Sequence, residues 1–235
     1  MIKYLKEKCN QKNIEITDNQ LHKFSVYYNH LMKVNQSMNL TTITDEKEVV
    51  LKHFLDSIMI INSLDFSGCR VIDVGTGAGF PGIPLAIMCT DANFVLLDSL
   101  QKRLHFIEEV LELCQISNVQ LIHGRAEDYG KDLIYREQFD YCLSRAVASL
   151  PVLLEFCIPF VKVGGKFISY KSELLTDELE TAKHAMEVLQ CKYVDNVSYD
   201  LPDIDVCRYY AFFEKTDILP SKYPRQAGKP KKKPL

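Results

Sequence analysis

The sequence predicts an α/β protein whose doubly wound parallel sheet ends in an antiparallel hairpin and carries an N-terminal helical cap. Three observations predict this fold class. From residue 66 onward, short apolar runs alternate with stretches of helical periodicity, as in a parallel sheet covered by crossover helices. A glycine-rich turn follows the first of these runs. The last two runs are joined by a short loop without a helix, so we expect them to pair antiparallel.

Residues 1–65 are predicted to form the helical cap, because apolar residues recur in them at helical spacing. One stretch holds Leu21, Phe24, Val26, Tyr28, Leu31 and Met32, and a second holds Val49, Val50, Phe54, Leu55, Ile58 and Ile61. His53 and Asp56 stand in the second stretch. They are expected either to cover a bound ligand or to brace the cap on the sheet, and the apolar neighbours favour bracing.

Residues 66–216 are predicted to form the sheet domain. The expected strands lie at about 70–74, 93–97, 119–122, 139–143, 166–170, 193–199 and 207–214, and the expected helices near 82–89, 100–115, 149–160 and 173–189. Ligands of open α/β sheets bind at the carboxyl ends of the strands. The loops that follow the strands are therefore expected to line the functional site.

The turn after the first strand is the most informative segment, VIDVGTGAGFPGIPLA from Val71 to Ala86. Gly75, Gly77 and Gly79 let the backbone turn sharply and approach a ligand closely. A dinucleotide-binding loop needs a small residue at the sixth position, which is Phe80 when counted from the first glycine. The glycine spacing recurs two residues later, but that register leaves the first turn unexplained. The loop therefore favours S-adenosylmethionine over NAD.

Two acidic residues accompany this turn. Asp98 ends the second apolar run, a spacing at which a carboxylate accepts hydrogen bonds from both ribose hydroxyls; its alternative role is to cap the helix that begins near Ser99. Asp73 precedes the turn, where it is expected to meet the amino group of the methionine moiety or, equally, the backbone of its own loop.

Polar residues also follow the third and fourth strands. Ala126 and Glu127 are expected to hold the ring edge and amino group of adenine, with a solvated loop acid as the alternative for Glu127. Arg145 stands where the methyl acceptor would meet the cofactor, and it is expected to position that acceptor, either as a phosphate or carboxylate clamp or as part of a structural ion pair.

The end of the fourth strand narrows the acceptor chemistry. Enzymes that methylate exocyclic amino groups of bases carry a D/N-P-P-Y/F motif here, whereas this chain has Ser144, Arg145, Ala146 and Val147. Cys142 lies inside the apolar strand, which favours a core side chain over a nucleophile. An acceptor with its own lone pair, such as a purine N7, remains. Alignment alone suffices for it, so no catalytic general base is required.

Composition sets further limits. The chain has 235 residues, and its eight cysteines form no CxxC pair and have no histidine at ligand spacing, which favours reduced thiols in a cytoplasm and no bound metal. No apolar run approaches the roughly 20 residues of a membrane helix. The polar start, MIKYLKEKCNQKN, does not resemble a signal peptide. We expect a cytoplasmic monomer without a membrane partner.

Charge is concentrated in the last region, a basic tail over residues 217–235. It contains Lys222, Arg225, Lys229, Lys231, Lys232 and Lys233 and no acidic residue after 221, while residues 1–221 carry 22 basic and 31 acidic side chains. Four prolines from Pro220 onward favour a disordered, solvated tail in isolation. A basic tail on an acidic body nevertheless indicates a polyanionic partner, and such arms often become ordered on nucleic acid. We expect an RNA-gripping arm that is no part of the cofactor site.

Three further cations extend this expected RNA surface. Arg125, Arg145 and Lys171 all fall in strand-end loops, where together they would contact RNA phosphates. An ordinary surface charge is the better interpretation of any one of them taken alone.

Taken together, these segments resemble the glucose-inhibited division protein B family, the small-subunit ribosomal RNA methyltransferases G. The resemblance rests on NLTTI from Asn39, HFLDS from His53, DVGTGAGFPGIPLAI from Asp73, LLDSLQKRLHFIEEV from Leu96, GRAEDYG from Gly124, SRAVASL from Ser144 and YPRQAGKPKKKPL from Tyr223. It implies a Rossmann-like class I methyltransferase of the bacterial cytoplasm that methylates N7 of one guanine in 16S ribosomal RNA or the small subunit. It also implies cofactor contacts at Gly75, Phe80, Ala126, Glu127 and Arg145, with Asp98 at the ribose.

Two alternatives stand beside this interpretation. One is a methyltransferase that acts on another RNA, a small molecule or a protein, for which the basic tail is incidental. The other is a noncatalytic RNA-binding module that has kept the sheet. Binding of S-adenosylmethionine separates the module from either enzyme, and ribosomal RNA as methyl acceptor separates the two enzymes.

Overall fold

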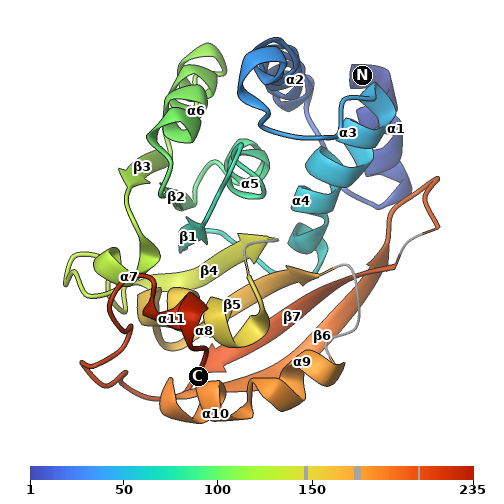
Figure 1. The fold of residues 1–235 in the computed structure, drawn as a ribbon. Coiled ribbons are helices and arrows are strands. Elements are labelled where there is room, and N and C mark those ends of the chain that lie inside the picture. Colours follow the sequence, from blue (N-terminus) through green and yellow to red (C-terminus); the bar gives the residue numbers. More distant parts are fainter. Residues whose placement is uncertain (146–147, 172–175, 206) are drawn as a thin grey trace.

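The computed structural model describes residues 1–145, 148–171, 176–205 and 207–235, and its strands form one mixed sheet in the order β3-β2-β1-β4-β5-β7-β6 (Figure 1). The strands are β1 (Arg70–Val74), β2 (Asn93–Asp98), β3 (Val119–His123), β4 (Phe139–Arg145), β5 (Val161–Lys171), β6 (Cys191–Asp200) and β7 (Cys207–Lys215). Strands β1 to β5 pair in parallel, and β7 runs antiparallel between β5 and β6. The predicted doubly wound sheet with a terminal antiparallel pair is therefore confirmed.

The helices also follow the predicted alternation. They are α1 (Ile2–Gln11), α2 (Asp18–Met38), α3 (Glu46–Val49), the π-helix η1 (Val50–Leu55), α4 (Asp56–Ile58), η2 (Met59–Asn62), α5 (Gly82–Met88), α6 (Gln101–Leu113), α7 (Ala126–Tyr129), α8 (Leu150–Cys157), η3 (Ile158–Phe160), α9 (Thr176–Thr181), α10 (Lys183–Val188) and α11 (Lys229–Lys232). The helix expected at 173–189 is divided into α9 and α10, and its first three residues lie outside the described ones. Strand β5 begins at Val161, five residues before the predicted start.

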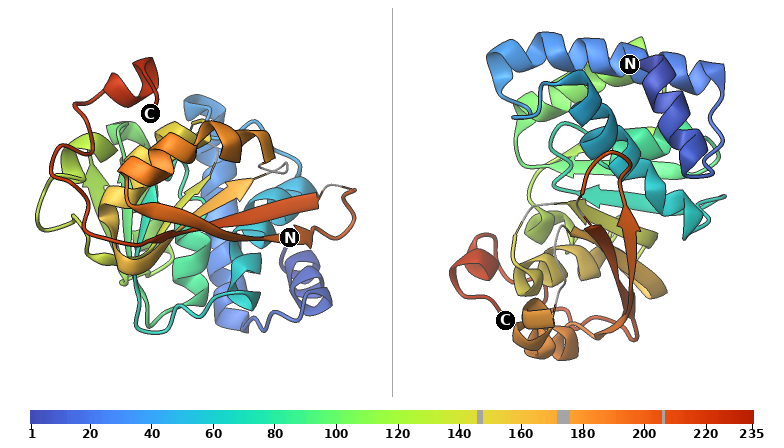
Figure 2. Two further views of the ribbon diagram at one scale, coloured as in Figure 1. Left: turned by 90° about the horizontal axis from the view of Figure 1, so that it is seen from below. Right: turned by 90° about the vertical axis from the view of Figure 1, so that its right-hand side faces the viewer.

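Helices cover both faces of the sheet and make three layers (Figures 1 and 2). Strand residues alternate between the two interiors: Val71 packs with the cap, α5 and α6, whereas Ile72 packs with α8 and α10. Leu143 and Cys142 of β4 divide in the same way. This period of two places neighbouring apolar residues of the inner strands against opposite helical layers. Among the described residues no helix is both long and apolar enough to cross a membrane.

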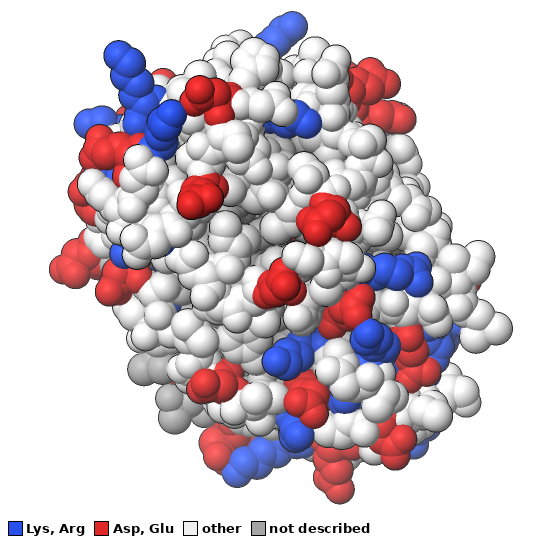
Figure 3. All heavy atoms as spheres, turned by 180° about the vertical axis from the view of Figure 1, so that it is seen from behind, with Lys and Arg blue, Asp and Glu red and all other residues white. Residues whose placement is uncertain are grey.

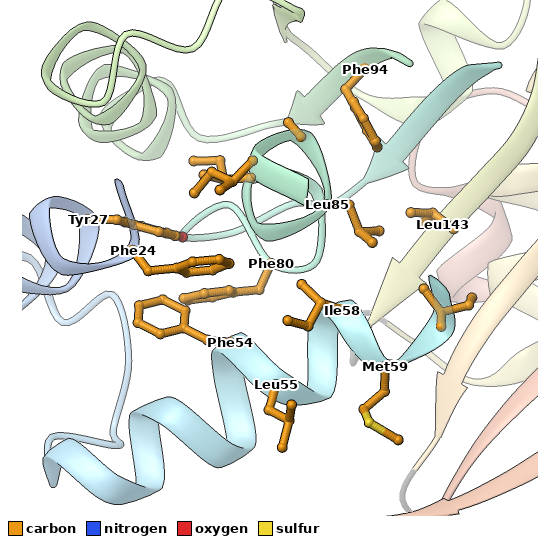
Figure 4. Close-up of a cluster of buried hydrophobic side chains, with 14 of the residues drawn as sticks. Phe24, Tyr27, Phe54, Leu55, Ile58, Met59, Phe80, Leu85, Phe94 and Leu143 are labelled. Carbon is orange, nitrogen blue, oxygen red and sulfur yellow. The ribbon is translucent and has the colours of Figure 1, made fainter. Parts of the chain in front are cut away.

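The cap joins the sheet through one continuous core. Its longest helix, α2, begins with a capping box, in which Thr17 and Gln20 each accept a hydrogen bond from the other's backbone amide. Phe24 of α2 and Phe54 of η1 pack against Phe80, which follows the glycine turn (Figure 4). The cap therefore fixes the glycine loop from one side.

The C-terminal tail departs from its predicted disorder. Leu219 and Tyr223 are buried in the core layer that contains α8. The Arg136 guanidinium donates hydrogen bonds to the Leu219 and Tyr223 carbonyls at 2.8 and 2.7 Å. Farther along, α11 lies beside α8 (Figure 1). Apolar and hydrogen-bonded anchors thus hold a segment that its charge and proline content marked as disordered.

Candidate cofactor and active site

A pocket of about 600 Å³ opens at the carboxyl ends of four neighbouring strands. This volume lies within the roughly 300–1,000 Å³ of small-molecule sites. The sheet order β3-β2-β1-β4 sets the order of the lining residues. These are Ala126 and Glu127 after β3, Asp98 at the end of β2, Gly75 and Gly77 after β1, and Arg145 at the end of β4. Along the pocket, the residues expected to contact adenine, ribose, methionine and the methyl acceptor therefore follow one another in space, in the order that an elongated ligand requires.

The glycine loop forms the middle wall of the pocket. Gly75 and Gly77 have φ angles of 74° and 64°, in the left-handed region that favours glycine. The Gly75 amide donates to the Leu97 carbonyl at 2.8 Å, which ties the turn to β2. A Cβ atom at Gly77 would contact nothing within 4 Å, so backbone conformation and not crowding requires glycine there. The predicted sharp turn is confirmed.

Two loop residues expected at the cofactor have other roles. Asp73 is fully buried and does not line the pocket; its Oδ2 accepts hydrogen bonds from the Thr76 hydroxyl at 2.7 Å and the Gly82 amide at 3.0 Å. Its Oδ1 has no partner among the described residues, and burial raises its pKa to about 6. Gly79 also lies off the pocket lining, and a Cβ there would meet Ile83 at 2.5 Å. Asp73 thus takes the second of its two predicted roles and braces its own loop, while Gly79 permits close packing.

Asp98 lies at the end of β2, where its carboxylate holds two neighbouring loops together. Its buried carboxylate accepts hydrogen bonds from the Leu100 amide through Oδ1 and from the Gly77 amide through Oδ2, each at 2.9 Å. The first bond closes a tight turn before α6, whose N-cap is Leu100 and has no side-chain cap hydrogen bond. The second bond links the ends of β1 and β2. Arg103 also approaches Oδ2, at 3.3 Å. Since Asp98 lines the pocket as well, a contact with ribose hydroxyls stays a prediction for this residue.

Phe80 connects the pocket to the cap. Its ring stacks on Tyr27 at a centroid distance of 5.4 Å and on His53 at 4.6 Å, and Phe80 also lines the pocket. Figure 4 shows Phe80 among the aromatic rings of the cap. The bulky residue that argued against a dinucleotide loop is therefore also the main contact between loop and cap. The position of Phe80 relative to the glycines predicted that the loop does not bind a dinucleotide, but it did not predict the contact with the cap.

The acceptor end of the pocket is organised by Arg145. Its Nη1 donates to the Asp56 carboxylate at 2.9 Å and to the Lys52 carbonyl at 3.2 Å. The other oxygen of Asp56 accepts a 2.8 Å hydrogen bond from Tyr199, so one buried carboxylate joins the cap to β4 and β6. The predicted bracing role of Asp56 is confirmed. Arg145 still lines the pocket, while Ala146 and Val147 lie outside the described residues.

Sequence reasoning missed Thr41 and undervalued His53. Both line the pocket. The Asn35 side chain holds Thr41 by donating to its carbonyl and accepting from its amide, each at 2.9 Å. His53 Nδ1 lies 3.4 Å from an Arg145 nitrogen, so Nδ1 accepts and Nε2–H donates to the Thr41 hydroxyl at 2.8 Å. Because Ile43 N–H donates to the same oxygen, the Thr41 hydroxyl proton is left to point elsewhere.

His53 is neutral in this arrangement. Burial and, to a lesser extent, the Arg145 charge lower its pKa to about 3. It stands in η1, a π-helical segment, and such segments often occur at functional sites. Thr41 belongs to the NLTTI segment, one of the segments on which the family resemblance rests. That resemblance was the one indication in the sequence that Thr41 has a role at the site.

The adenine end brings two predicted residues together with the tail. Ala126 and Glu127 line it with Phe156, and so do Gly228 and Lys231. The Gly228 amide donates to Glu127 Oε1 at 2.8 Å. The structure thus places part of the tail, which was expected to lie away from the cofactor site, in the lining of this pocket.

The cations expected on RNA divide into two groups. Lys171 pairs with Glu178 at 2.6 Å, and Arg225 pairs with the fully buried Glu155, so both take part in ion pairs within the chain, and RNA contact stays a prediction for them. The exposed cations near the pocket are Arg125, Lys229, Lys231, Lys232 and Lys233. On the described part of the face seen in Figure 3, acidic and basic side chains are interspersed.

Cys142 has the surroundings of a core residue. It is fully buried, and burial raises the pKa of its thiol well above the ordinary range. A thiolate nucleophile is disfavoured there. Among the described residues, no group of three His, Cys, Asp or Glu side chains has the arrangement of a metal site.

The comparisons with known proteins agree with this geometry. The profile of the GidB family, described as rRNA small subunit methyltransferase G, matches residues 20–202. The ribosomal RNA small subunit methyltransferase G of Alkaliphilus oremlandii is 49% identical over 233 residues, which is 98% of this chain and 97% of that protein. The protein of the same name from Acetivibrio thermocellus is 46% identical over 99% of this chain and 96% of its own.

Solved structures show the same fold at low sequence identity. TYW2 from M. jannaschii in complex with AdoMet has a TM-score of 0.51 and 20% identity, covering 65% of this chain and 71% of that one. A SAM-dependent O-methyltransferase from Thermotoga maritima has a TM-score of 0.52 and 17% identity, covering 81% and 72%. These likenesses show a class I methyltransferase fold and nothing further about the acceptor.

Proposed function

Because the chain belongs to the rRNA small subunit methyltransferase G family and is an S-adenosylmethionine-dependent methyltransferase, we propose that its methyl acceptor is N7 of a guanine in 16S ribosomal RNA. S-adenosylmethionine, when bound, supplies an electrophilic methyl group on its sulfonium. The pocket fits that cofactor, since its volume is adequate and its four strand ends offer partners in the order of the cofactor's parts.

One observation carries the choice of N7: the acceptor end offers hydrogen-bond donors and no carboxylate among its described lining residues, which are Leu40, Thr41, His53, Phe80 and Arg145. Asp56 lies behind this end, but it is engaged by Arg145 and Tyr199. His53 is a weak base, because its pKa is about 3. An acceptor that must lose a proton finds no base here, whereas a guanine N7 has a free lone pair and needs only alignment.

The donors also suit the guanine edge. Guanine presents N7 and O6 as acceptors, whereas adenine presents N7 beside a 6-amino donor. Thr41 has a hydroxyl proton to donate, and Arg145 has a guanidinium fixed by Asp56 and His53. Either donor can meet O6 while N7 faces the cofactor. Adenine in the same place would set its amino group against these donors.

RNA binding is assigned to the exposed cations around the pocket. Arg125 follows β3, and Lys229, Lys231, Lys232 and Lys233 lie on or next to α11. Phosphate contacts of this kind position the RNA, while the pocket selects the base. The names of the relatives support small-subunit ribosomal RNA as the partner, in naked or assembled form, and a cytoplasmic setting. We propose that the protein acts there as a monomer.

The direct test uses small ribosomal subunits from cells that lack this protein. Incubation with methyl-labelled S-adenosylmethionine should label one guanine of 16S RNA, and nuclease digestion should release N7-methylguanosine. Label in ribosomal protein, another RNA or a small molecule would favour the alternative acceptors. A chain that binds the RNA but shows no calorimetric heat with S-adenosylhomocysteine would be a noncatalytic RNA-binding module.

A further inference from the structure

We propose that the C-terminal tail is part of the cofactor site, where the Gly228 amide positions the Glu127 carboxylate to accept a hydrogen bond from the 6-amino group of adenine. The inference concerns the cofactor alone and holds whatever the methyl acceptor is. It gives residues 226–232 a binding role in addition to their proposed contact with RNA.

Gly228 and Glu127 are in direct contact in the pocket. Glu127 is 5% exposed, and both residues line the pocket. Hydrogen bonds are what fix the orientation of a buried carboxylate. Oε1 accepts from the Gly228 amide at 2.8 Å, and since Oε2 has no hydrogen-bond donor among the described residues, it can accept from a donor in the pocket. Gly228 directs its amide this way with φ at 82°, a left-handed conformation that other residues seldom adopt.

The chemistry of this end of the pocket favours an adenine ring. Ala126 and Phe156 supply apolar surface to the pocket, and both are mostly buried. The Lys231 ammonium lies 5.9 Å from the centre of the Phe156 ring, so the tail also borders this apolar surface. A flat heterocycle with one amino donor at its edge matches an apolar wall with one oriented carboxylate oxygen.

The tail reaches the pocket from a firm anchor. The Arg225 backbone amide and Nε each donate to Glu155 Oε1 at 2.8 Å, and Glu155 is fully buried in α8. Only Gln226 and Ala227 separate this anchor from Gly228. Pro230, two residues farther on, is buried as well. Anchors on both sides of Gly228 thus preorganise its amide, so little ordering remains to be done when the cofactor binds.

The test compares two ligands that differ at the position in question. S-inosylhomocysteine carries a carbonyl oxygen where S-adenosylhomocysteine carries the 6-amino group. Calorimetry should show that the intact chain prefers the adenosyl ligand by about tenfold to a hundredfold, the effect of one hydrogen bond to a charged group. The same titrations are made on a chain that ends at Arg225, which keeps the anchor and lacks the Gly228 amide.

We expect the shortened chain to bind the adenosyl ligand more weakly and to lose most of its preference, with little change for the inosyl ligand. Glu127→Gln should remove the preference in both chains. A full-length variant with Lys229, Lys232 and Lys233 changed to Gln is the control, because it lowers the tail's charge but keeps the amide, and its preference should be intact.

Gly228→Ala in the full chain is a second variant, which tests the same contact if the shortened chain does not fold. A Cβ there would contact nothing within 4 Å, so only the positive φ is disfavoured, and a partial loss of preference is expected. The proposal is overturned if the shortened chain keeps the full preference, or if it loses equal affinity for both ligands. No RNA is used, so failure of the acceptor proposal and failure of this one are separate results.

Discussion

Replacing Asp73 by asparagine should stabilise the fold at neutral pH and leave it nearly unchanged in acid. The side chain is fully buried, one of its oxygens has no partner among the described residues, and its charge is therefore poorly compensated. Asparagine keeps an oxygen that can accept from the Thr76 hydroxyl and the Gly82 amide. It removes the negative charge and places an amide NH2 group at the position of Oδ1, which has no partner among the described residues.

The magnitude follows from the pKa. Burial raises the pKa of Asp73 from its ordinary 3.8 to about 6, and each unit of difference between folded and unfolded chain corresponds to about 1.4 kcal/mol. Below the unfolded value both states are protonated, and ionisation costs no stability. As the pH rises through the folded value, the cost reaches about 3 kcal/mol. Stability contributed by protonated Asp73 is thus present in acid and lost toward neutrality.

Urea unfolding of the wild type and Asp73→Asn between about pH 4 and pH 7.5 measures this effect. The difference in unfolding free energy should move in favour of asparagine by about 3 kcal/mol across that range. Asp91→Asn, which removes an exposed carboxylate, is the control for general charge effects. A difference that is constant with pH, or that moves toward the wild type, would show that Asp73 is ionised without cost in the folded protein.

Three further predictions concern the site and the tail. Asp98→Asn should raise the calorimetric Kd for S-adenosylhomocysteine on the order of tenfold through weakened ribose contacts; an unchanged Kd would leave Asp98 with its loop hydrogen bonds alone. The single-turnover rate of methylation at saturating RNA should be nearly constant from about pH 7 to pH 9, which lies above the pKa of His53 and of Asp73; a rate that rises steeply with pH would indicate a general base. Cys142→Ser should remain active, and a trapped covalent RNA adduct would instead indicate a thiolate nucleophile. Arg225→Ala should lower the unfolding free energy by about 3–5 kcal/mol, because it leaves Glu155 buried and unpaired; a change below about 1 kcal/mol in urea titrations would contradict that role.

The sequence by itself determined the sheet, its antiparallel end and the glycine turn. These features depend on local rules: an alternation of apolar residues with a period of two, a helical period between strands, and glycines where φ must be positive. Strand order then follows from short right-handed connections. For this reason Gly75, Asp98, Glu127 and Arg145 were expected at strand ends and are found lining one pocket.

The tertiary structure alone decided which side chains of the site and of the tail form ion pairs with one another. Glu155 and Arg225 are 70 residues apart in sequence, and Arg145 and Asp56 are 89 apart, so no periodicity or spacing relates them. Charge and proline content predicted a disordered tail, because composition reflects the average tendency of a segment to fold. It contains no information about a specific ion pair, such as the one between Arg225 and a single buried carboxylate elsewhere in the chain. Packing places that carboxylate in α8, and the tail follows it to the cofactor pocket.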